Sequence, residues 1–499
     1  MEKNLIHLQE ILFGSSDKKL SKEISAYVKR GIAKKIAPRL YTTNLTEFAA
    51  SIIKRNWFRI IAEQYPGAQL SHRSALECRP TPAGHIYVTY TYTKNIELPG
   101  LTIHFQKGRG QIGGDKSFFG ELYISQESRA YLENLQPSRN NGELSKTLGR
   151  QELEERLETV VRTRGEQGLN ALRETARSVA GQLEMERQFD LLNTLISALL
   201  ATKSSKILSS SVAKARALGE PFDPVRIRLF EKLYESLAGV QFRQYADKNQ
   251  SHKSYQNFAF FESYFSNYIE GTIFELAEAK QIILTETPIP ARNEDSHDVL
   301  GTYKLVSNKK EMAVCPNTAD ELLEILRYRH KILMSARADK TPGYFKDKNN
   351  RAGNTEFVDF DLVTGTLKKG FEWYRLLNDP FARSAYIMFL ISEVHPFLDG
   401  NGRVARIMMN AELSSSNLSK IIVPTVFRED YMGALRLLTR QGQGGAFIRM
   451  LTRLYEFSST VFGEDINKLE QYLRSCDAFM EPKVGQLHFK SILRYLGKP

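Results

Sequence analysis

A polar, glycine-rich turn at residues 395–410, HPFLDGNGRVARIMMN, lies between two apolar stretches and limits how this part of the chain can fold. Apolar residues recur at helical spacing both before and after the turn. The positions expected to face inward are Ile387, Leu390, Ile391 and Val394 before it and Val404, Ile407, Met408 and Ala411 after it. The pattern predicts two buried helices joined by a short loop, with His395 at the end of the first.

The turn itself, residues 399–402 (DGNG), has the composition of an anion-binding site. Its two glycines allow the backbone to turn tightly and to present N–H groups at the start of a helix, where anions bind favourably. Arg403 and Arg406 are three residues apart, so both side chains can reach the same anion. Two arginines beside a helix start favour a polyphosphate over a single carboxylate.

Two more side chains of the motif suit transfer chemistry. Asp399 is a hard oxygen ligand, and magnesium typically binds one or two carboxylates together with substrate phosphates. His395 can take a proton from an attacking group, because the ordinary pKa of histidine is close to neutral. The motif has no Ser or Cys nucleophile, which indicates that the attacking hydroxyl comes from a second substrate. The residues therefore indicate metal-assisted transfer from a nucleoside polyphosphate.

This stretch resembles the signature of the Fic family, His-x-Phe-x-Asp/Glu-Gly-Asn-Gly-Arg-x-x-Arg. The matching positions are His395, Phe397, Asp399, Gly400, Asn401, Gly402, Arg403 and Arg406. The resemblance extends over residues 241–465 and implies a helical catalytic domain. It implies that this domain moves AMP from ATP onto a hydroxyl side chain of a target protein.

The resemblance also implies a role for each residue. It implies that His395 deprotonates the target hydroxyl and that Asp399 holds Mg²⁺ on the phosphates. It places the glycine turn and Asn401 on the α-phosphate, and Arg403 and Arg406 on the β- and γ-phosphates.

An upstream stretch, SNYIEG at residues 266–271, resembles the inhibitory helix pattern Ser/Thr-x-x-x-Glu-Gly/Asn of the same family. Ser266 and Glu270 are four residues apart, so they lie on one face of a helix. The resemblance implies that Glu270 pairs with Arg406 where the γ-phosphate would bind. A carboxylate competes with phosphate for the same guanidinium fork. The alternative is a capped helix that carries a surface glutamate.

A predicted hairpin at residues 343–361 lies where the family has its flap, which adds a strand of the target protein by main-chain pairing. It is longer and less regular than the usual flap pattern. By its position in the family pattern Tyr431 stacks on adenine; an ordinary core tyrosine is the alternative. The fold class expected for residues 241–465 is mainly α, a Fic-type helical domain with a β-hairpin flap.

Length and composition are those of a globular protein of several domains. The 499 residues suggest about three domains. The longest apolar runs are too short for a membrane span, and we expect no membrane partner. The first sixteen residues, MEKNLIHLQEILFGSS, suggest an amphipathic helix rather than a secretion signal, which favours the cytoplasm. The three cysteines show no metal-binding spacing, and their odd number suits a reducing compartment.

The N-terminal 60 residues are basic, with twelve Lys or Arg against five acids. Residues 4–12 and the segment that ends at Gly31 suggest two short helices, and IAKKIAPRLYTT suggests a β wing. With LSHRSALE further on, this region resembles the winged-helix start of AbiEi-type abortive-infection antitoxins, over about residues 1–125. The resemblance implies binding to double-stranded DNA through residues 1–60. A solvated basic face without a partner is the alternative.

The middle of the chain divides by composition. Residues 61–136 predict a small α/β domain, 137–240 a helical linker domain, and 466–499 a helical tail after the catalytic domain. Gly108, Gly110 and Gly113 spell the dinucleotide pattern GxGxxG. A strand rather than a helix is expected after them, so GRGQIGG is interpreted as a hairpin loop.

Three other functions stay open from the sequence. The same fold can transfer UMP, phosphate or phosphocholine, and the mass added to a target would show which. It can remove AMP, with Glu270 as the base for water. A DNA-binding regulator that senses ATP is the third, and DNA binding with and without ATP would test it. The target protein, including this chain itself, and the oligomeric state are not indicated.

Overall fold

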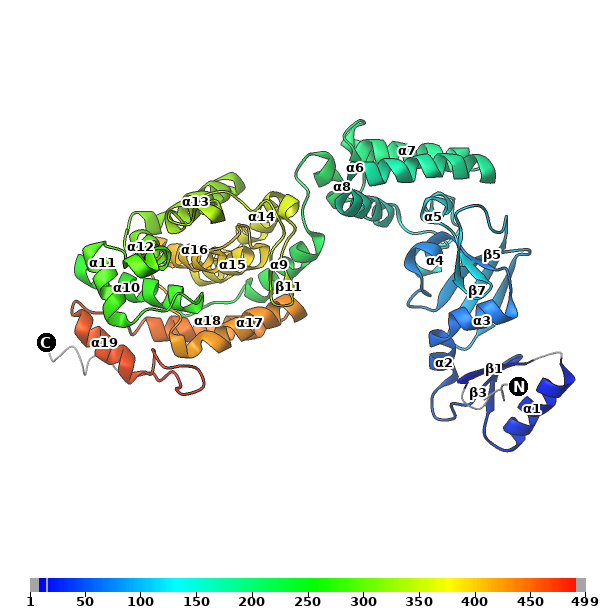
Figure 1. Ribbon diagram of the computed structural model, residues 1–499, viewed down its shortest axis with the longest axis horizontal. Coiled ribbons are helices and arrows are strands. Elements are labelled where there is room, and N and C mark those ends of the chain that lie inside the picture. Colours follow the sequence, from blue (N-terminus) through cyan, green and yellow to red (C-terminus); the bar gives the residue numbers. More distant parts are fainter. Residues whose placement is uncertain (1–8, 15–16, 491–499) are drawn as a thin grey trace. The chain divides into compact units, whose positions relative to one another are not determined.

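The computed structural model describes residues 9–14 and 17–490 of the chain (Figure 1). The chain divides into two compact units, one that ends at Gly219 and one that begins at Glu220. The first contains both β-sheets of three or more strands, and the described part of the second is mainly helical with one short hairpin. The expected mainly helical architecture with an N-terminal α/β region is therefore confirmed.

The first unit begins with a three-stranded antiparallel sheet in the order β1-β3-β2. Its strands are β1 (Ile11–Phe13), β2 (Lys34–Ala37) and β3 (Leu40–Thr42), and helix α1 (Lys18–Lys29) lies between β1 and β2 in the sequence. The prediction of a helix over residues 4–12 is wrong for its described part, residues 9–12. Ile11 and Leu12 are both buried but join different hydrophobic clusters, and a strand buried on both faces has no helical periodicity. Residues 4–8 lie outside the described part.

The winged-helix identity of this region stays a prediction. The sequence suggests two helices before the wing, whereas in the described part of the chain one helix, α1, precedes the β2–β3 hairpin. The hairpin does occupy the position of the predicted wing. Asp17 caps α1 by accepting hydrogen bonds from the N–H groups of Lys19 and Leu20.

A six-stranded mixed sheet follows, in the order β6-β7-β5-β4-β9-β8. Its strands are β4 (Gln69–Leu70), β5 (His85–Tyr90), β6 (Lys94–Leu98), β7 (Leu101–Lys107), β8 (Lys116–Phe119) and β9 (Leu122–Ile124). The helices of this region are α2 (Ala49–Arg55), α3 (Trp57–Gln64), α4 (His72–Glu77) and α5 (Glu127–Asn134). Residues 61–136, where the sequence predicts both helices and strands, contain both.

The glycine-rich segment GRGQIGG connects β7 to β8, which are not neighbours in the sheet. The expected loop is present, but it crosses the sheet and is not a hairpin. A strand follows it, so it lacks the helix that a dinucleotide site requires. Its backbone carbonyls at Arg109 and Gly110 accept hydrogen bonds from the buried guanidinium of Arg129, at 2.7 and 2.8 Å. Asp115 and Glu133 pair with the same guanidinium, so the loop encloses an arginine rather than a phosphate.

Three helices complete the first unit: α6 (Arg150–Leu183), α7 (Glu186–Leu199) and α8 (Ser211–Ala217). Helix α6 is broken at Gly165, whose φ of 68° and ψ of −177° are not helical. Only glycine adopts this conformation readily, because a Cβ would clash with the backbone. Helices therefore occupy most of residues 150–217, within the region where the sequence predicts a helical linker domain.

The second unit is an assembly of helices around one core. Its helices are α9 (Pro224–Leu237), α10 (His252–Ile269), α11 (Leu276–Thr285), α12 (Asn293–Val306), α13 (Ala319–Leu333), α14 (Val363–Tyr374), α15 (Pro380–Val394), α16 (Asn401–Ser415), α17 (Arg428–Gln441), α18 (Gly444–Ser458) and α19 (Ile466–Ser475). A two-stranded hairpin, β10 (Arg351–Ala352) and β11 (Thr355–Glu356), lies between α13 and α14.

Helices α15 and α16 lie in the middle of the second unit (Figure 1). All eight predicted inward-facing residues on them are at most 1 % exposed, which confirms the two buried helices. The core also includes Leu229 and Phe230 of α9 and Leu469 and Leu473 of α19. Helices assigned by composition to a linker domain and to a tail therefore contribute to the same core as the motif.

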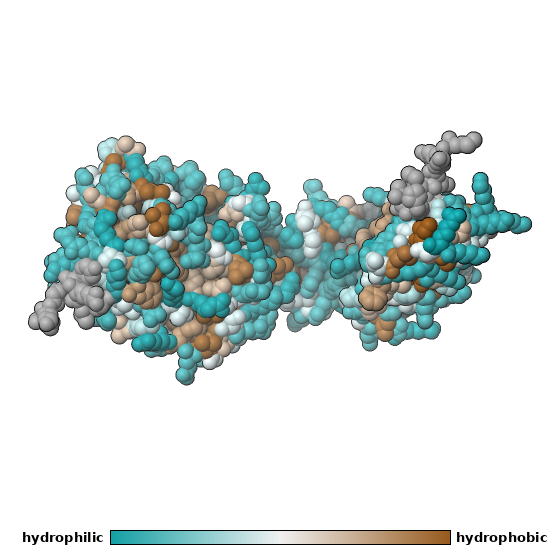
Figure 2. Space-filling model, turned by 90° about the horizontal axis from the view of Figure 1, so that it is seen from below, coloured by the Kyte–Doolittle hydropathy of each residue, from teal (hydrophilic) through white to brown (hydrophobic). Residues whose placement is uncertain are grey.

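The surface seen in Figure 2 is mainly hydrophilic, with scattered hydrophobic side chains. Within residues 9–14 and 17–490, no helix combines the length and the apolar character needed to cross a bilayer.

Candidate active site

The motif loop begins where α15 ends. His395 is the C-cap of α15 and has a left-handed backbone conformation, with φ of 53°. Non-glycine residues adopt this conformation at a cost of the order of 1 kcal/mol, and such strain concentrates at functional sites. Gly400, with φ of 74°, then turns the chain into α16. No side chain caps the start of α16, so its first N–H groups remain available to an anion.

The side chain of Asn401 stabilises the conformation of the motif loop. Its side-chain oxygen accepts a hydrogen bond from the Phe397 N–H at 2.8 Å, and its amide nitrogen donates to the Phe397 carbonyl at 2.9 Å. Both residues are buried. The amide side chain of Asn401 is therefore engaged within the loop. An anion at this position would meet backbone N–H groups rather than the side chain that the resemblance assigns to the α-phosphate.

The imidazole of His395 is partly buried, and its tautomer is fixed by one contact. Nδ1 lies 3.4 Å from the carbonyl oxygen of Ser392, which can only accept, so Nδ1 carries the proton and Nε2 is free to accept one. Burial, followed by the positive charge of Lys346, lowers the pKa of His395 to about 4. The ring of Phe357 stacks on the imidazole at a centroid distance of 3.7 Å. The ring is therefore neutral at physiological pH, as a general base must be.

A second histidine, His330 of α13, contacts the motif loop at Phe397 and Asp399. Its Nδ1 accepts a hydrogen bond from the Gly343 N–H at 2.9 Å, so its Nε2 carries the proton and donates to the Asp399 carbonyl at 3.1 Å. Its ring stacks on Phe397 at 3.7 Å. Burial lowers the pKa of His330 to about 4, which keeps it neutral. Nothing in its local sequence distinguishes His330 from an ordinary helical residue.

Arg406 and Glu270 form the ion pair that the resemblance implies. Nη2 of Arg406 lies 2.7 Å from Oε1 of Glu270, the C-cap residue of α10. Ser266, one turn earlier on α10, accepts hydrogen bonds from the same guanidinium through its hydroxyl at 3.0 Å and its carbonyl at 2.8 Å. The guanidinium is almost fully buried, whereas the Glu270 carboxylate that it holds is partly exposed to solvent.

The carboxylate of Glu270 lies over Gly402 in the first turn of α16. A Cβ atom at residue 402 would come within 2.1 Å of Oε1 of Glu270. Burial raises the pKa of Glu270, but the charges of Arg406 and Arg403 outweigh this and hold it below its ordinary value. An ionised carboxylate therefore lies at the open amide end of α16, in the position of an anionic ligand.

Tyr431 faces Arg406 rather than an open cavity. It is 1 % exposed, and its hydroxyl accepts a hydrogen bond from Nη1 of Arg406 at 3.3 Å. This is the core placement that the sequence left open, and here its ring is not presented for stacking on adenine.

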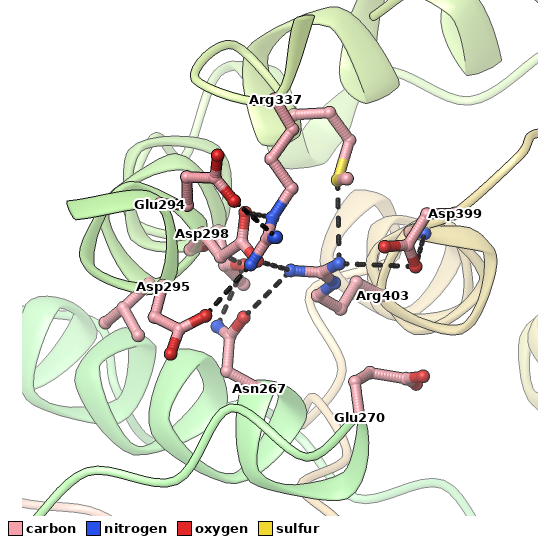
Figure 3. Close-up of polar contacts among 12 residues, drawn as sticks. Asn267, Glu270, Glu294, Asp295, Asp298, Arg337, Asp399 and Arg403 are labelled. Atoms are coloured by element: carbon pink, nitrogen blue, oxygen red, sulfur yellow. Dashed lines mark hydrogen bonds and ion pairs between the residues drawn. The ribbon is translucent and has the colours of Figure 1, made fainter. Parts of the chain in front are cut away.

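Arg403 has a partner that the sequence did not reveal. Its Nη1 lies 2.7 Å from Oδ2 of Asp298 on α12 and 3.4 Å from Oδ1 of Asn267 on α10 (Figure 3). Its Nη2 lies 3.8 Å from Oδ1 of Asp399. Asp298 lies more than a hundred residues before Arg403 in the sequence, and no spacing pattern connects the two.

Asp399 has the chemistry and the exposure that a magnesium ligand needs. Its side chain is 45 % exposed, and Oδ1 accepts a hydrogen bond from the Gly400 N–H at 2.6 Å. In the described part of the chain, no three His, Cys, Asp or Glu side chains gather into a metal-binding cluster. A single carboxylate suits Mg²⁺ that arrives with its phosphates, because Mg²⁺ often keeps most of its ligands from substrate and water.

The predicted flap hairpin is present and is attached to the motif loop. Strands β10 and β11 pair antiparallel, and Gly353 turns the tip with φ of 56°. The Lys346 N–H donates to the Pro396 carbonyl at 2.8 Å, and Asn350 donates from Nδ2 to the Phe397 carbonyl at 2.9 Å. The flap therefore supplies partners for two carbonyls of the loop that carries His395.

A second attachment joins the flap to helix α9. Arg226 donates from Nη2 to the Glu356 carbonyl of β11 at 2.6 Å, and its Nε lies 2.6 Å from Oε1 of Glu393. Glu393 is 2 % exposed and precedes His395 by two residues. The sequence did not indicate Arg226, which lies more than 160 residues before the motif.

Comparison with known proteins finds a family match for the segment that contains the motif. Residues 320–413 match the model of the Fic/DOC family. Among curated relatives, a protein adenylyltransferase fic-1 of Caenorhabditis elegans is 24 % identical over 229 residues, 44 % of this chain and 45 % of that protein. A protein adenylyltransferase Fic of Drosophila persimilis is 22 % identical over 259 residues, 50 % of this chain and 49 % of that protein.

The chain spans about half the length of the curated relatives it matches. Among solved structures, a Fic-1 structure from C. elegans aligns at 18 % identity with a TM-score of 0.36, covering 64 % of this chain and 98 % of that one. A Fic-domain signaling protein from Bacteroides thetaiotaomicron aligns at 18 % identity with a TM-score of 0.37, covering 49 % of this chain and 97 % of that one. The chain thus carries a Fic/DOC family domain and is distantly related to Fic adenylyltransferases.

Proposed function

We propose that the second unit is a protein adenylyltransferase that transfers AMP from ATP to a Ser, Thr or Tyr hydroxyl of a target protein. The observation that carries the proposal is the ion pair between Arg406 and Glu270, whose carboxylate also lies over the amide end of α16 at Gly402. A phosphate would make the same contacts, with the same sign of charge. The names of the distant relatives agree with this chemistry.

The transfer step follows from the fixed tautomer of His395. The target hydroxyl attacks the α-phosphorus of ATP, and its proton moves to the free Nε2 of His395. A new P–O bond to the target forms as the bond between the α-phosphorus and the bridging oxygen breaks, and pyrophosphate leaves. Asp399 would hold Mg²⁺, which neutralises charge on the phosphates. The N–H groups of α16 and Arg406 bind the phosphate oxygens.

Glu270 acts as a brake in this proposal. While its carboxylate holds Arg406, a γ-phosphate cannot use the same guanidinium fork. We expect Glu270→Gly to raise AMP transfer at least about tenfold, because a charge-assisted contact of this kind contributes roughly 1.5–3 kcal/mol. His395→Ala in the same background is expected to abolish transfer.

The test compares the full-length wild type, Glu270→Gly and Glu270→Gly/His395→Ala with ATP labelled on the α- or the γ-phosphate. Label retained on protein, including the chain itself, is expected from α-labelled ATP only. Retention of the γ-label would instead show phosphate transfer. Equal labelling of wild type and Glu270→Gly would contradict the inhibitory role of Glu270. Labelling that survives His395→Ala would contradict the role of His395 as the base. Loss of AMP from a pre-modified target, faster in wild type than in Glu270→Gly, would favour AMP removal.

We also propose that the N-terminal region binds double-stranded DNA. The observation in favour is a group of exposed cations on α1 and the β2–β3 hairpin. These are Lys18, Lys19, Lys22, Lys29, Arg30, Lys35 and Arg39. Only two acids, Asp17 and Glu23, lie between residues 17 and 41. Such a surface attracts phosphates without reading the bases. The chain would then join a DNA-binding region to a self-inhibited transferase.

A further inference from the structure

The two arginines of the motif are paired with carboxylates in different surroundings. Glu270, the partner of Arg406, has a side chain that is 32 % exposed. Asp298, the partner of Arg403, is 2 % exposed, and the Arg403 side chain is 3 % exposed. A phosphate that enters from solvent can therefore replace Glu270, whereas Asp298 lies behind the guanidinium that it holds.

Asp298 is itself fixed by a second arginine. Arg337, between α13 and the flap, donates from Nε to both carboxylate oxygens of Asp298 at 3.0 and 3.1 Å (Figure 3). The outer nitrogens of Arg337 bind Glu294 and Asp295 of the same α12 helix, at 2.9 Å each. Three carboxylates thus share Arg337, and in the described part of the chain Asp298 is the one that also contacts Arg403.

These contacts determine the orientation of the Arg403 side chain. Apart from Asp298, the acid nearest to its guanidinium is Asp399, the candidate Mg²⁺ ligand, at 3.8 Å. Without Asp298, a buried guanidinium would lack its close counter-charge, which is costly, and it would turn toward Asp399. Such a turn would remove a cation from the phosphates and neutralise the metal ligand.

We infer that Asp298 is a positioning residue that keeps Arg403 beside the phosphate site whether or not Glu270 is in place. Arg403 is then a permanently oriented phosphate contact, and Arg406 is the contact that Glu270 switches. This inference rests on the proposed function, because it takes the ligand of the site to be a nucleoside triphosphate.

Two carboxylates that hold neighbouring arginines therefore have opposite effects. Removal of Glu270 frees Arg406 and strengthens ATP binding. Removal of the Asp298 charge misdirects Arg403 and weakens binding by about tenfold, as expected for loss of a charge-assisted contact.

The experiment measures Mg²⁺–ATP binding by calorimetry to full-length Glu270→Gly, with and without Asp298→Asn. Asp295→Asn is the matched control, since Asp295 lies one turn away and contacts Arg337 but not Arg403. We expect the dissociation constant to rise about tenfold in Asp298→Asn and less than about twofold in the control. Equal affinities for the two variants would overturn the inference and leave the proposed function standing. Absence of ATP binding by Glu270→Gly itself would overturn both.

A double-mutant cycle separates positioning from general damage to the fold. In an Arg403→Gln background, Asp298→Asn leaves no buried charge at either position and is expected to leave the dissociation constant unchanged, because Asp298 acts through Arg403. If Asp298→Asn alone does not fold, the measurement in the Arg403→Gln background still tests the role of Asp298. A further loss of affinity of more than about threefold in this background would show that Asp298 acts through some other residue.

Discussion

The imidazole of His395 is neutral because of where the fold places it. Burial comes first and the charge of Lys346 second, and together they lower its pKa to about 4, against the raising effects of the Ser392 carbonyl, Glu270 and Asp399. A general base with this pKa stays unprotonated far below neutral pH. The same low pKa makes His395 a weak base, which reduces the driving force for taking the proton.

The first prediction concerns the pH dependence of transfer. In Glu270→Gly, kcat/KM for ATP is expected to stay level from about pH 8 to about pH 5.5 and to fall with a midpoint near 4. Loss of Glu270 removes one influence that raises the pKa, so the midpoint does not move upward. A profile with its midpoint near 6.5, the ordinary value of histidine, would contradict the burial argument.

Unfolding must be separated from protonation in this experiment. His330 and His395 both have lowered pKa values, so between about pH 6.5 and 4 the unfolded chain binds more protons than the folded one. The free energy of unfolding therefore falls as the pH falls through this range. Circular dichroism at each pH shows whether a loss of activity precedes the loss of structure.

The second prediction tests the position of the Glu270 carboxylate. In wild type, Gly402→Ala places a Cβ atom against Oε1 of Glu270 and is expected to cost about 1–3 kcal/mol. In Glu270→Gly the carboxylate is gone and the close neighbour that remains is Nη1 of Arg406, at 3.2 Å on a flexible side chain. Alanine in a helix is favoured over glycine by up to about 1 kcal/mol. The sign of the effect on Tm should therefore reverse between the two backgrounds. The same loss in both would show that the carboxylate does not lie over Gly402.

At the residue scale, the sequence predicts the site well where the residues are adjacent or at helical spacing. His395, Asp399 and the two arginines come from one continuous motif, and Glu270 comes from a short helical pattern. The partners that orient them, such as Asp298 and His330, come from distant helices. Their positions depend on tertiary packing, and a single sequence carries no local signal for it.

Among elements, the flap and helix α9 are joined by Arg226, which contacts Glu356 of β11 and Glu393 of α15. The third prediction is that Arg226→Met loosens the hairpin while its apolar stem still packs. Hydrogen exchange at residues 351–357 should become about tenfold faster, as expected for loss of one charge-assisted hydrogen bond.

The matched control for this change is Arg228→Met. Arg228 lies two residues along α9, is exposed and has no ion pair among the described residues. Its replacement should leave the exchange of the hairpin unchanged. If both variants accelerate exchange equally, the effect comes from α9 as a whole and not from the contact between Arg226 and Glu356.

Elements with strong periodicity are predicted well, and short elements buried on two faces are not. Helices α15 and α16 follow from apolar spacing alone. Strand β1 was expected as a helix, because three consecutive apolar residues fit either structure when each face of the strand meets its own cluster. The cross-sheet path of GRGQIGG depends on the buried Arg129, which no local pattern reveals.

On the scale of the whole chain, the candidate DNA-binding surface and the candidate active site are in separate units. The exposed cations of α1 and the β2–β3 hairpin belong to the first unit, and the proposed nucleotide site belongs to the second. Lys18, Lys22 and Lys29 are spaced by four and seven residues, so they lie on one face of α1. This face is the candidate phosphate-binding surface.

The last prediction is that this face carries most of the affinity for DNA. Full-length protein with Lys18, Lys22 and Lys29 changed to Gln should bind a labelled duplex more weakly. The slope of log K against log salt should fall by about 2 to 3, because each lost phosphate contact removes about 0.9. Anisotropy titrations at several salt concentrations measure both quantities.

The control removes the same charge elsewhere in the first unit, by changing Lys203, Lys206 and Lys214 to Gln; all three are exposed near α7 and α8. If DNA binding depends on the α1 face, this variant keeps the wild-type slope. Equal loss in both variants would mean that net charge alone attracts DNA. Because the two triple changes leave the nucleotide site untouched, Glu270→Gly should retain its ATP affinity in both, which separates DNA binding from transfer.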